Sequence, residues 1–184
     1  NFQKDKTFVP ELRGKHIFKY GYLWDKKHFI SYGSWLAAPR NEKFFTGKRI
    51  IFREILGEKN LICTVIEEDY KIGRSLYIAL PKSEIDIYYI QGLLASKLMA
   101  WFFRHEKNEF DDLFPKIRVE EFKKLPIKFN KIIQEKITPS VIKILAAKKA
   151  NPSAETSEWE AEIDEMVFEL YGLTEEEKEL VRGK

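Results

Sequence analysis

The chain has 184 residues, of which 44% are hydrophobic and 14% aromatic, so it is long enough to bury a core and too apolar to be disordered. No apolar run approaches the roughly 18 to 20 residues that span a bilayer, so we expect a cytoplasmic protein without a membrane partner. The single cysteine, Cys63, excludes an internal disulfide and a cysteine-based zinc site.

The net charge of +3 is distributed unevenly. Residues 1–128 contain 24 Lys and Arg against 17 Asp and Glu, whereas residues 129–184 contain 8 against 12. A basic region suits a polyanionic partner, and an acidic tail does not. Because the chain starts at Asn1 without a methionine, we expect it to be a piece of a longer polypeptide.

The first 80 residues are predicted to form strands. Over residues 16–24, side chains alternate so that one face of a half-buried strand would carry Phe18, Tyr20, Tyr22 and Trp24. Further short apolar runs predict strands at residues 29–32, 49–55, 61–66 and 76–80. The polar residues 57–60 between two of these runs predict a hairpin loop.

A helix is predicted from Asp86 to about Arg104. Ser83, followed three residues later by Asp86, marks its start, where a carboxylate would accept from the free N–H groups of the first turn. Its apolar positions recur at helical spacing: Ile90, Leu93, Leu94, Leu98, Trp101 and Phe102. A polar, acidic loop is expected over residues 105–114. A second helical stretch, residues 131–149, should bend or restart at Pro139.

The tail is predicted to hold two more helices. One starts at Ser157, and its apolar stripe follows helical spacing over Ile163, Met166, Val167, Leu170 and Tyr171. Gly172 should cap its C-terminus, and Thr174 with Glu177 should form a capping box for the next helix. The sequence thus predicts an α+β fold, in which a twisted, mainly antiparallel sheet packs on the long helix 86–104. We assign residues 1–128 to this domain and residues 129–184 to a helical C-terminal appendage.

Catalytic motifs are absent from the sequence. An adenine-specific methyltransferase needs an Asn-Pro-Pro-aromatic loop and an S-adenosylmethionine pocket, but Asn151 and Pro152 are followed by Ser153, and no glycine-rich turn joins a strand to a helix. We therefore expect no catalytic, cofactor-binding or metal-ligating residues.

The short Asp/Glu-x-Lys motif of metal-dependent nucleases occurs twice, at residues 69–71 and 176–178. In both places, charged side chains exposed to solvent are the better interpretation. The three histidines, His16, His28 and His105, have no metal-ligand spacing in the sequence, and we interpret them as lone surface or sheet residues.

Basic residues are the best candidates for a site. Arg49 and Arg53 are four apart on a predicted strand and so share a face, with Arg40, Lys43 and Lys48 in the adjoining loop. Arginine can donate two hydrogen bonds to guanine or phosphate, so this set is a candidate DNA-binding surface. The alternative is that these side chains only keep a sheet face soluble.

A second basic set follows the long helix: Lys116, Arg118 and Lys123, interleaved with acids that could pair with them. Aromatic residues of the strand region could stack on a displaced base or fill the core, and both interpretations stay open: Tyr20, Tyr22, Trp24, Tyr32 and Trp35.

Three blocks of the sequence resemble one family. The first runs from Ile30-Ser31-Tyr32-Gly33-Ser34-Trp35-Leu36 to Arg53, the second covers residues 88–128 with its closing Leu125-Pro126-Ile127, and the third is residues 163–174. Together they resemble the TaqI-like C-terminal specificity domain of adenine-specific DNA methyltransferases and type IIG restriction-modification enzymes.

The resemblance implies that residues 1–128 are a DNA target-recognition domain that reads duplex DNA for an N-terminal methyltransferase domain of the same polypeptide. S-adenosylmethionine would be the cofactor of that parent enzyme, with magnesium added if the parent also cleaves DNA. Two alternatives remain: a protein-docking module that uses the acidic helical tail, and a metal-dependent nuclease domain.

Overall fold

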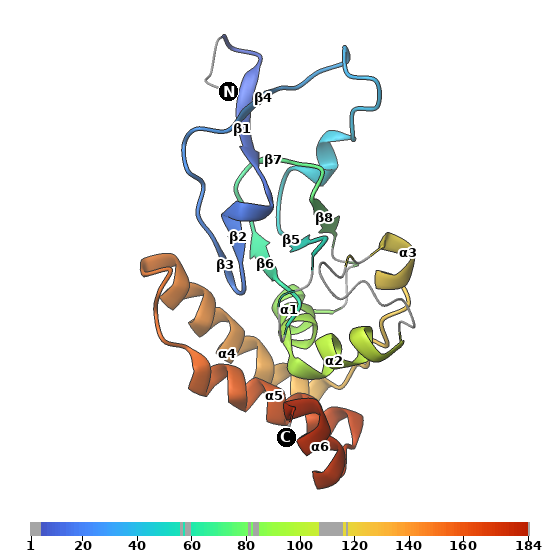
Figure 1. The fold of residues 1–184 in the computed structure, drawn as a ribbon. Coiled ribbons are helices and arrows are strands. Elements are labelled where there is room, and N and C mark those ends of the chain that lie inside the picture. The colour runs from blue at the N-terminus through green and yellow to red at the C-terminus, as the bar shows by residue number, and fades with distance from the viewer. Residues whose placement is uncertain are drawn as a thin grey trace.

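The computed structural model describes residues 5–55, 57, 60–80, 82, 85–106, 116 and 118–183. Strands occupy the N-terminal half of the chain and helices the C-terminal half, and the two halves lie at opposite ends of the molecule (Figure 1). The strands are β1 (Phe8–Leu12), β2 (Ile17–Phe18), β3 (Gly21–Tyr22), β4 (Phe29–Ser31), β5 (Arg49–Arg53), β6 (Cys63–Ile66), β7 (Lys71–Ile72) and β8 (Leu76–Ala79). Two short 3-10 helices, η1 (Gly14–His16) and η2 (Glu42–Phe44), lie among them.

The helices are α1 (Ile87–Ala95), α2 (Lys97–Glu106), α3 (Val119–Phe122), α4 (Lys131–Ala150), α5 (Ser157–Tyr171) and α6 (Glu175–Arg182). The predicted α+β class with mainly antiparallel pairing is therefore confirmed. None of the described helices is long and apolar enough to cross a membrane.

One of the two three-stranded sheets among the described residues has β5 as its central strand. This strand pairs antiparallel with β6 on one side and with β8 on the other, as Ile51 lies opposite Thr64 and Ile78. The β5–β6 pairing agrees with the predicted hairpin, whose loop lies only partly within the described residues.

The N-terminal strands differ most from the prediction. The strand expected over residues 16–24 is a hairpin of β2 and β3, because Tyr20 adopts a left-handed conformation (φ 60°) that turns the chain back. Two further strands were not predicted: β1 contains Pro10, which argues against a strand, and β7 has only two residues. Nevertheless β1 pairs antiparallel with β4 and parallel with β7.

Both faces of β5 are buried, each in a different core. Ile50 and Phe52 belong to a large core that also contains residues of α1, α2, α4 and α5. Ile51 points the other way, into a smaller core with residues of β1, β2 and β8, such as Leu12 and Leu76. The sheet of β6, β5 and β8 thus separates the large core of the helical half from the smaller core of the outer strands.

The predicted long helix 86–104 is two helices, separated at Ser96. Asp86 caps α1 as expected, with its carboxylate accepting from the N–H groups of Tyr88 and Tyr89, whereas Ser83 lies outside the described residues. At the break, the Ser96 hydroxyl donates to the carbonyl of Leu93, and the buried carboxylate of Asp164 in α5 accepts from the N–H of Lys97 at 2.9 Å. Burial raises the pKa of Asp164, and its contacts with Lys97 oppose that rise.

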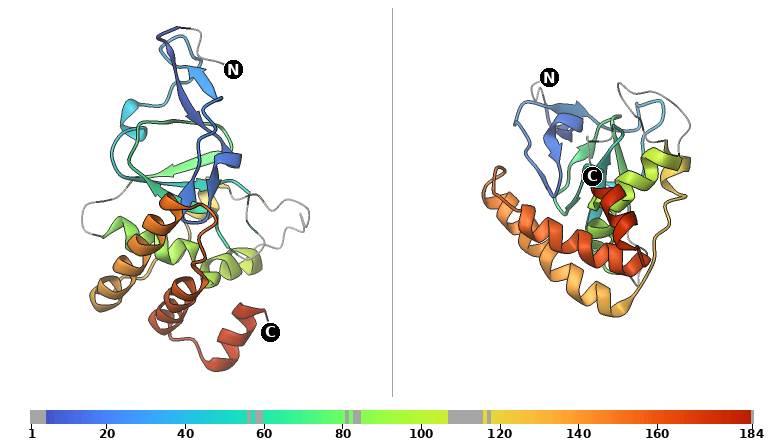
Figure 2. Two further views of the ribbon diagram at one scale, coloured as in Figure 1. Left: turned by 90° about the vertical axis from the view of Figure 1, so that its left-hand side faces the viewer. Right: turned by 60° about the horizontal axis from the view of Figure 1, so that its bottom comes forward.

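The C-terminal helices pack against α1 and α2 and against one another; α4 and α5 run side by side (Figure 2). The predicted restart at Pro139 is wrong, since α4 is one continuous helix that contains the proline, whereas the bend that was the other expectation stays a prediction. Gly92 lets α1 approach α4 closely, since a Cβ there would lie 2.5 Å from Ile137. The left-handed Gly172 cap and the capping box of Thr174 are both present.

The predicted division at residue 128 stays a prediction, although α4 and α5 contribute to the same core as β5 and β6. The apolar stripe of α5 faces this core: Ile163 and Val167 are fully buried. The stripe is therefore covered by the chain's own helices and is not free to dock another protein, whereas a docking role for other parts of the tail stays a hypothesis.

We expect Val167→Asp to destabilise the protein by several kcal/mol, because the new carboxylate would be buried without a partner. The matched control is Ala161→Asp, which places the same side chain on the exposed face of α5 and should change stability little. Chemical denaturation measures both. Equal midpoints for the two variants would mean that the stripe is not buried in solution.

Candidate nucleic-acid interface

Arg49, the first residue of β5, does not lie on the surface. Its side chain is fully buried, and its guanidinium donates to the carbonyl of Gly47 at 2.7 Å and to the carbonyl of Glu68 at 2.6 Å. Burial lowers its pKa, while the charges of Asp69 and Glu68 oppose that shift. The predicted exposure of Arg49 is therefore wrong: the face that it shares with Ile51 is covered by the smaller core.

Three predicted residues lie in or next to the loop that precedes β5. Arg40 is exposed, and its carbonyl accepts from the Tyr32 hydroxyl at 3.0 Å. Lys43 lies on η2 and is exposed. Lys48 is half-exposed and turns toward the helices, 3.4 Å from Glu67 and over the Tyr88 ring.

The remaining predicted residues lie at the opposite end of β5. Arg53 is partly buried at the end of the strand, and Ile55 forms a β-bridge with Lys116. Arg118 precedes α3, and Lys123 pairs with Glu120 at 2.7 Å. The structure thus separates the predicted residues into a group at the loop before β5 and a group beside α3.

The strand pairing brings a further set of cations to Arg53. The N–H of Gly14 donates to the Ser75 hydroxyl at 3.1 Å, and a Cβ on Gly14 would lie 3.9 Å from Nε of Arg53. Arg13 and Lys15 flank this glycine, and Arg74, which is exposed, precedes Ser75. We call Arg13, Lys15, Arg53 and Arg74 the basic band.

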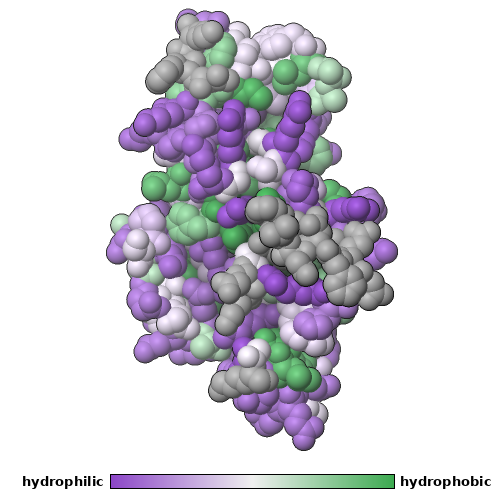
Figure 3. Space-filling view, in the orientation of Figure 1, coloured by the Kyte–Doolittle hydropathy of each residue, from purple (hydrophilic) through white to green (hydrophobic). Residues whose placement is uncertain are grey.

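The basic band could not be found from sequence, since its residues come from η1, β5 and the β7–β8 turn. Figure 3 shows hydrophilic side chains on the strand-rich half and on the helical half alike. Two of the cations have acidic partners: Arg13 pairs with Glu11 at 2.6 Å and Lys15 with Asp25 at 2.9 Å. Cations on neighbouring segments of the chain suit the phosphates of a nucleic acid.

The five aromatic candidates have different environments. Tyr20 is buried in the large core, and Tyr22, Trp24 and Tyr32 pack against the smaller core. Trp35 is 60% exposed, in the loop between β4 and η2 that also carries Arg40. Figure 1 shows this loop projecting at the end of the molecule away from α5 and α6. Trp35 is therefore the member of this set that is placed to contact a base.

A cleft of about 540 Å³ separates the β2–β3 hairpin and β6 from α4. Tyr22, Trp24 and Tyr88 contribute to its wall. Two pairs of its polar groups contact each other: the Tyr88 hydroxyl donates to Glu67, and Lys149 lies 3.4 Å from Glu68.

The interpretation of the histidines as lone residues is wrong for two of them. His16 and His28 meet edge to face, with ring centroids 5.1 Å apart, and Asp25 lies between them. Burial raises the pKa of Asp25, but hydrogen bonds from His28, Lys15 and the Lys27 amide outweigh it and hold that pKa well below its usual value. Among the described residues, His16, Asp25 and His28 form the group close enough to hold a metal ion. Asp69, from the nuclease-like motif at residues 69–71, is not part of it.

The model of one family, the TaqI-like C-terminal specificity domain, matches residues 9–127, which is more than half of the chain. The chain therefore belongs to the TaqI-like C-terminal specificity domain family, as predicted. The match starts in β1 and ends before α4, so the predicted likeness of residues 163–174 lies outside it. A search of curated proteins gave no match.

Membership gives the class of function. Specificity domains of this kind serve in DNA target recognition within methyltransferase or restriction-modification proteins, and such a domain is not catalytic on its own. The matched stretch contains the whole basic band and the loop with Trp35 and Arg40.

Replacement of Arg49 by Met should destabilise the protein by about 1–3 kcal/mol, because the carbonyls of Gly47 and Glu68 would lose hydrogen bonds from a charged donor. Arg49→Lys should also destabilise, since an ammonium cannot reach both carbonyls in the same way. Denaturant titration measures these changes. If Arg49→Lys kept full stability yet weakened DNA binding, Arg49 would be a DNA contact and not an internal one.

Proposed function

We propose that this chain recognises a specific duplex DNA sequence for a larger S-adenosylmethionine-dependent, adenine-specific DNA methyltransferase or type IIG restriction-modification protein. The observation that carries the proposal is the family match over residues 9–127, which includes the strands and loops that present the cations. The N-terminal catalytic domain of the same polypeptide would complete the DNA-binding cleft.

In this proposal the chemistry belongs to the catalytic domain. S-adenosylmethionine, and magnesium in a parent that cleaves DNA, would bind there and not to this chain. The role of the present chain would be to place one target site in register, so that the catalytic domain meets the correct adenine. Phosphate contacts set position, whereas contacts to base edges and DNA shape set sequence preference.

Two surfaces would share the binding. The basic band lies next to the rigid β5–β8 pair and suits phosphate contacts, whose geometry does not depend on sequence. The loop between β4 and η2 carries Trp35 and Arg40, which suit contacts to bases: arginine can donate two hydrogen bonds to guanine, and an indole can stack or wedge. Lys43 on η2 extends this loop surface.

Removal of a band arginine should weaken binding to all DNA sequences. In the intact polypeptide, Arg53→Ala and Arg74→Ala should each reduce the slope of log affinity against log salt by about one, as expected for one lost phosphate contact. Lys136→Ala is the matched control, because it removes one exposed charge from α4, in the helical half. The measurement is fluorescence anisotropy with duplexes of random sequence. Wild-type slopes in both folded arginine variants would contradict phosphate binding by the band.

The loop should instead control sequence preference. We expect Arg40→Ala to cost on the order of 1–3 kcal/mol at the cognate site and little on other DNA. Selection from a random duplex library identifies the preferred site directly, and the variant should lose preference at one or two base pairs. Unchanged preference in Arg40→Ala and in Trp35→Ala would place base reading elsewhere, with the group beside α3 next in line.

A further inference from the structure

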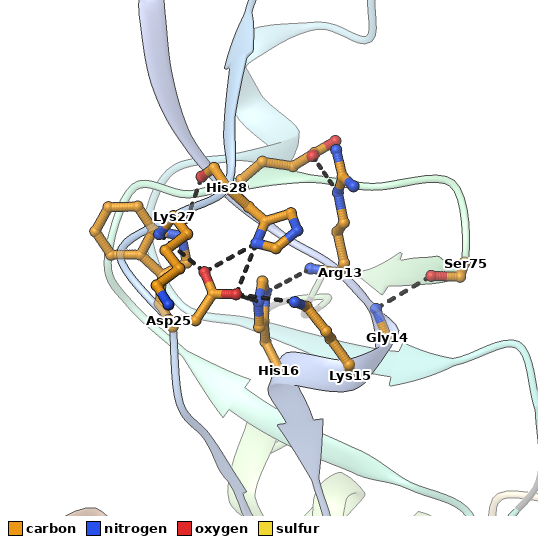
Figure 4. Close-up of polar contacts among 10 residues, drawn as sticks. Arg13, Gly14, Lys15, His16, Asp25, Lys27, His28 and Ser75 are labelled. Carbon is orange, nitrogen blue, oxygen red and sulfur yellow. Dashed lines mark hydrogen bonds and ion pairs between the residues drawn. The ribbon is translucent and has the colours of Figure 1, made fainter. Parts of the chain in front are cut away.

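Three side chains that could ligate a metal come together beside the basic band. His16 is the last residue of η1, whereas Asp25 and His28 lie in the segment between β3 and β4. Figure 4 shows the carboxylate of Asp25 between the two imidazole rings. Its Oδ2 lies 3.2 Å from Nε2 of His16 and 2.7 Å from Nδ1 of His28, and the three potential ligand atoms all lie within 4.8 Å of one another.

The inner wall of this group is buried, and its outer side reaches solvent. His16 is 3% exposed, and its Nε2 is buried without a well-aligned hydrogen-bond partner although it faces the carboxylate. The side chains of Asp25 and His28 are 27% and 19% exposed. A buried ring nitrogen that points at a carboxylate and a second imidazole, with a path to solvent, is the arrangement of a three-ligand metal site.

We propose that His16 Nε2, Asp25 and His28 Nδ1 bind a divalent transition-metal ion, with Zn²⁺ as the best fit to two imidazoles and one carboxylate. Tetrahedral Zn²⁺ holds three such ligands at about 2.0–2.2 Å and leaves a fourth position for water. Imidazole ligands disfavour Mg²⁺ and Ca²⁺, which prefer oxygen. The open fourth position distinguishes this site from a closed zinc site with four protein ligands.

Metal binding requires two local changes. Lys15, whose ammonium lies 2.9 Å from Asp25, must turn away, and its side chain is 59% exposed and can reach solvent. Coordination through Nε2 also leaves the ring proton of His16 on Nδ1, where the N–H of Arg13 now donates at 3.0 Å. The metal and this hydrogen bond therefore exclude each other, and the Arg13 amide reports directly on occupancy.

The consequence of binding is a link between two loops. A metal would join η1 to the β3–β4 segment, and it would release the Lys15 ammonium, which belongs to the basic band, from its pair with Asp25. The site would act on the DNA-binding surface through this lysine, not through a contact of its own.

The test is a thermal-unfolding titration of the protein with Zn²⁺, and with Mg²⁺ as the comparison ion. Zn²⁺ should raise the melting temperature progressively with concentration, and Mg²⁺ should not. His28→Ala and Asp25→Asn should raise the half-saturating Zn²⁺ concentration by more than about tenfold, the lower bound known for losses in the outer shell of such sites. His105→Ala, which removes an exposed histidine from α2, is the matched control and should behave as wild type.

Two further readouts do not depend on stability. Co²⁺ should give the visible absorption of tetrahedral coordination in the wild type and lose it in His28→Ala, and the Arg13 amide signal should shift when metal is added. The proposal is overturned if Zn²⁺ leaves the melting temperature and the Arg13 signal unchanged, or if His28→Ala responds as the wild type does. Because no readout uses DNA, that failure would leave the proposed DNA recognition untouched.

Discussion

The burial of β5 on both faces is the constraint on which the rest of the structure depends. A strand with one face in each of two cores cannot present side chains to solvent along its length, so its polar residues must be satisfied internally or lie at its ends. Arg49 donates internally to two carbonyls, and Arg53 lies at the end of the strand. The rigid centre therefore carries no exposed charge, and the exposed charge lies in the turns around it.

Local signals were sufficient for most of the fold. Asp86, Gly172 and Thr174 act at helix ends as their residue types predict, because capping involves only neighbouring N–H and C=O groups. The antiparallel strands β5, β6 and β8 follow from their apolar runs. The break at Ser96 could not be predicted, since the carboxylate that accepts from the first N–H of α2 comes from Asp164, on a helix far along the chain.

The candidate site was less predictable, for a related reason. Because side chains alternate along a strand, Arg49 and Arg53, four residues apart, were expected on the same face, and this is compatible with the geometry of β5. What covers the face, however, comes from β1 and β8, and β1 was hidden by Pro10. The band itself requires the Gly14 contact with Ser75, and the histidine pair requires two loops to meet. Side chains that only tertiary contacts bring together show no regular spacing in the sequence by which they could be recognised.

The same topology decides from which side DNA can approach. The acidic helix α6, with Glu175, Glu176 and Glu177 in its first turn, lies at the end of the molecule opposite the loop that carries Trp35 (Figure 1). A polyanion is repelled from the first end and attracted to the cations of the strand-rich half, so the charge asymmetry orients the molecule before any base is read. Because α5 and α6 contribute to packing with the inner helices, the tail can stay acidic without loss of stability. The acidic tail and the candidate DNA-binding surface thus lie at different ends of one chain.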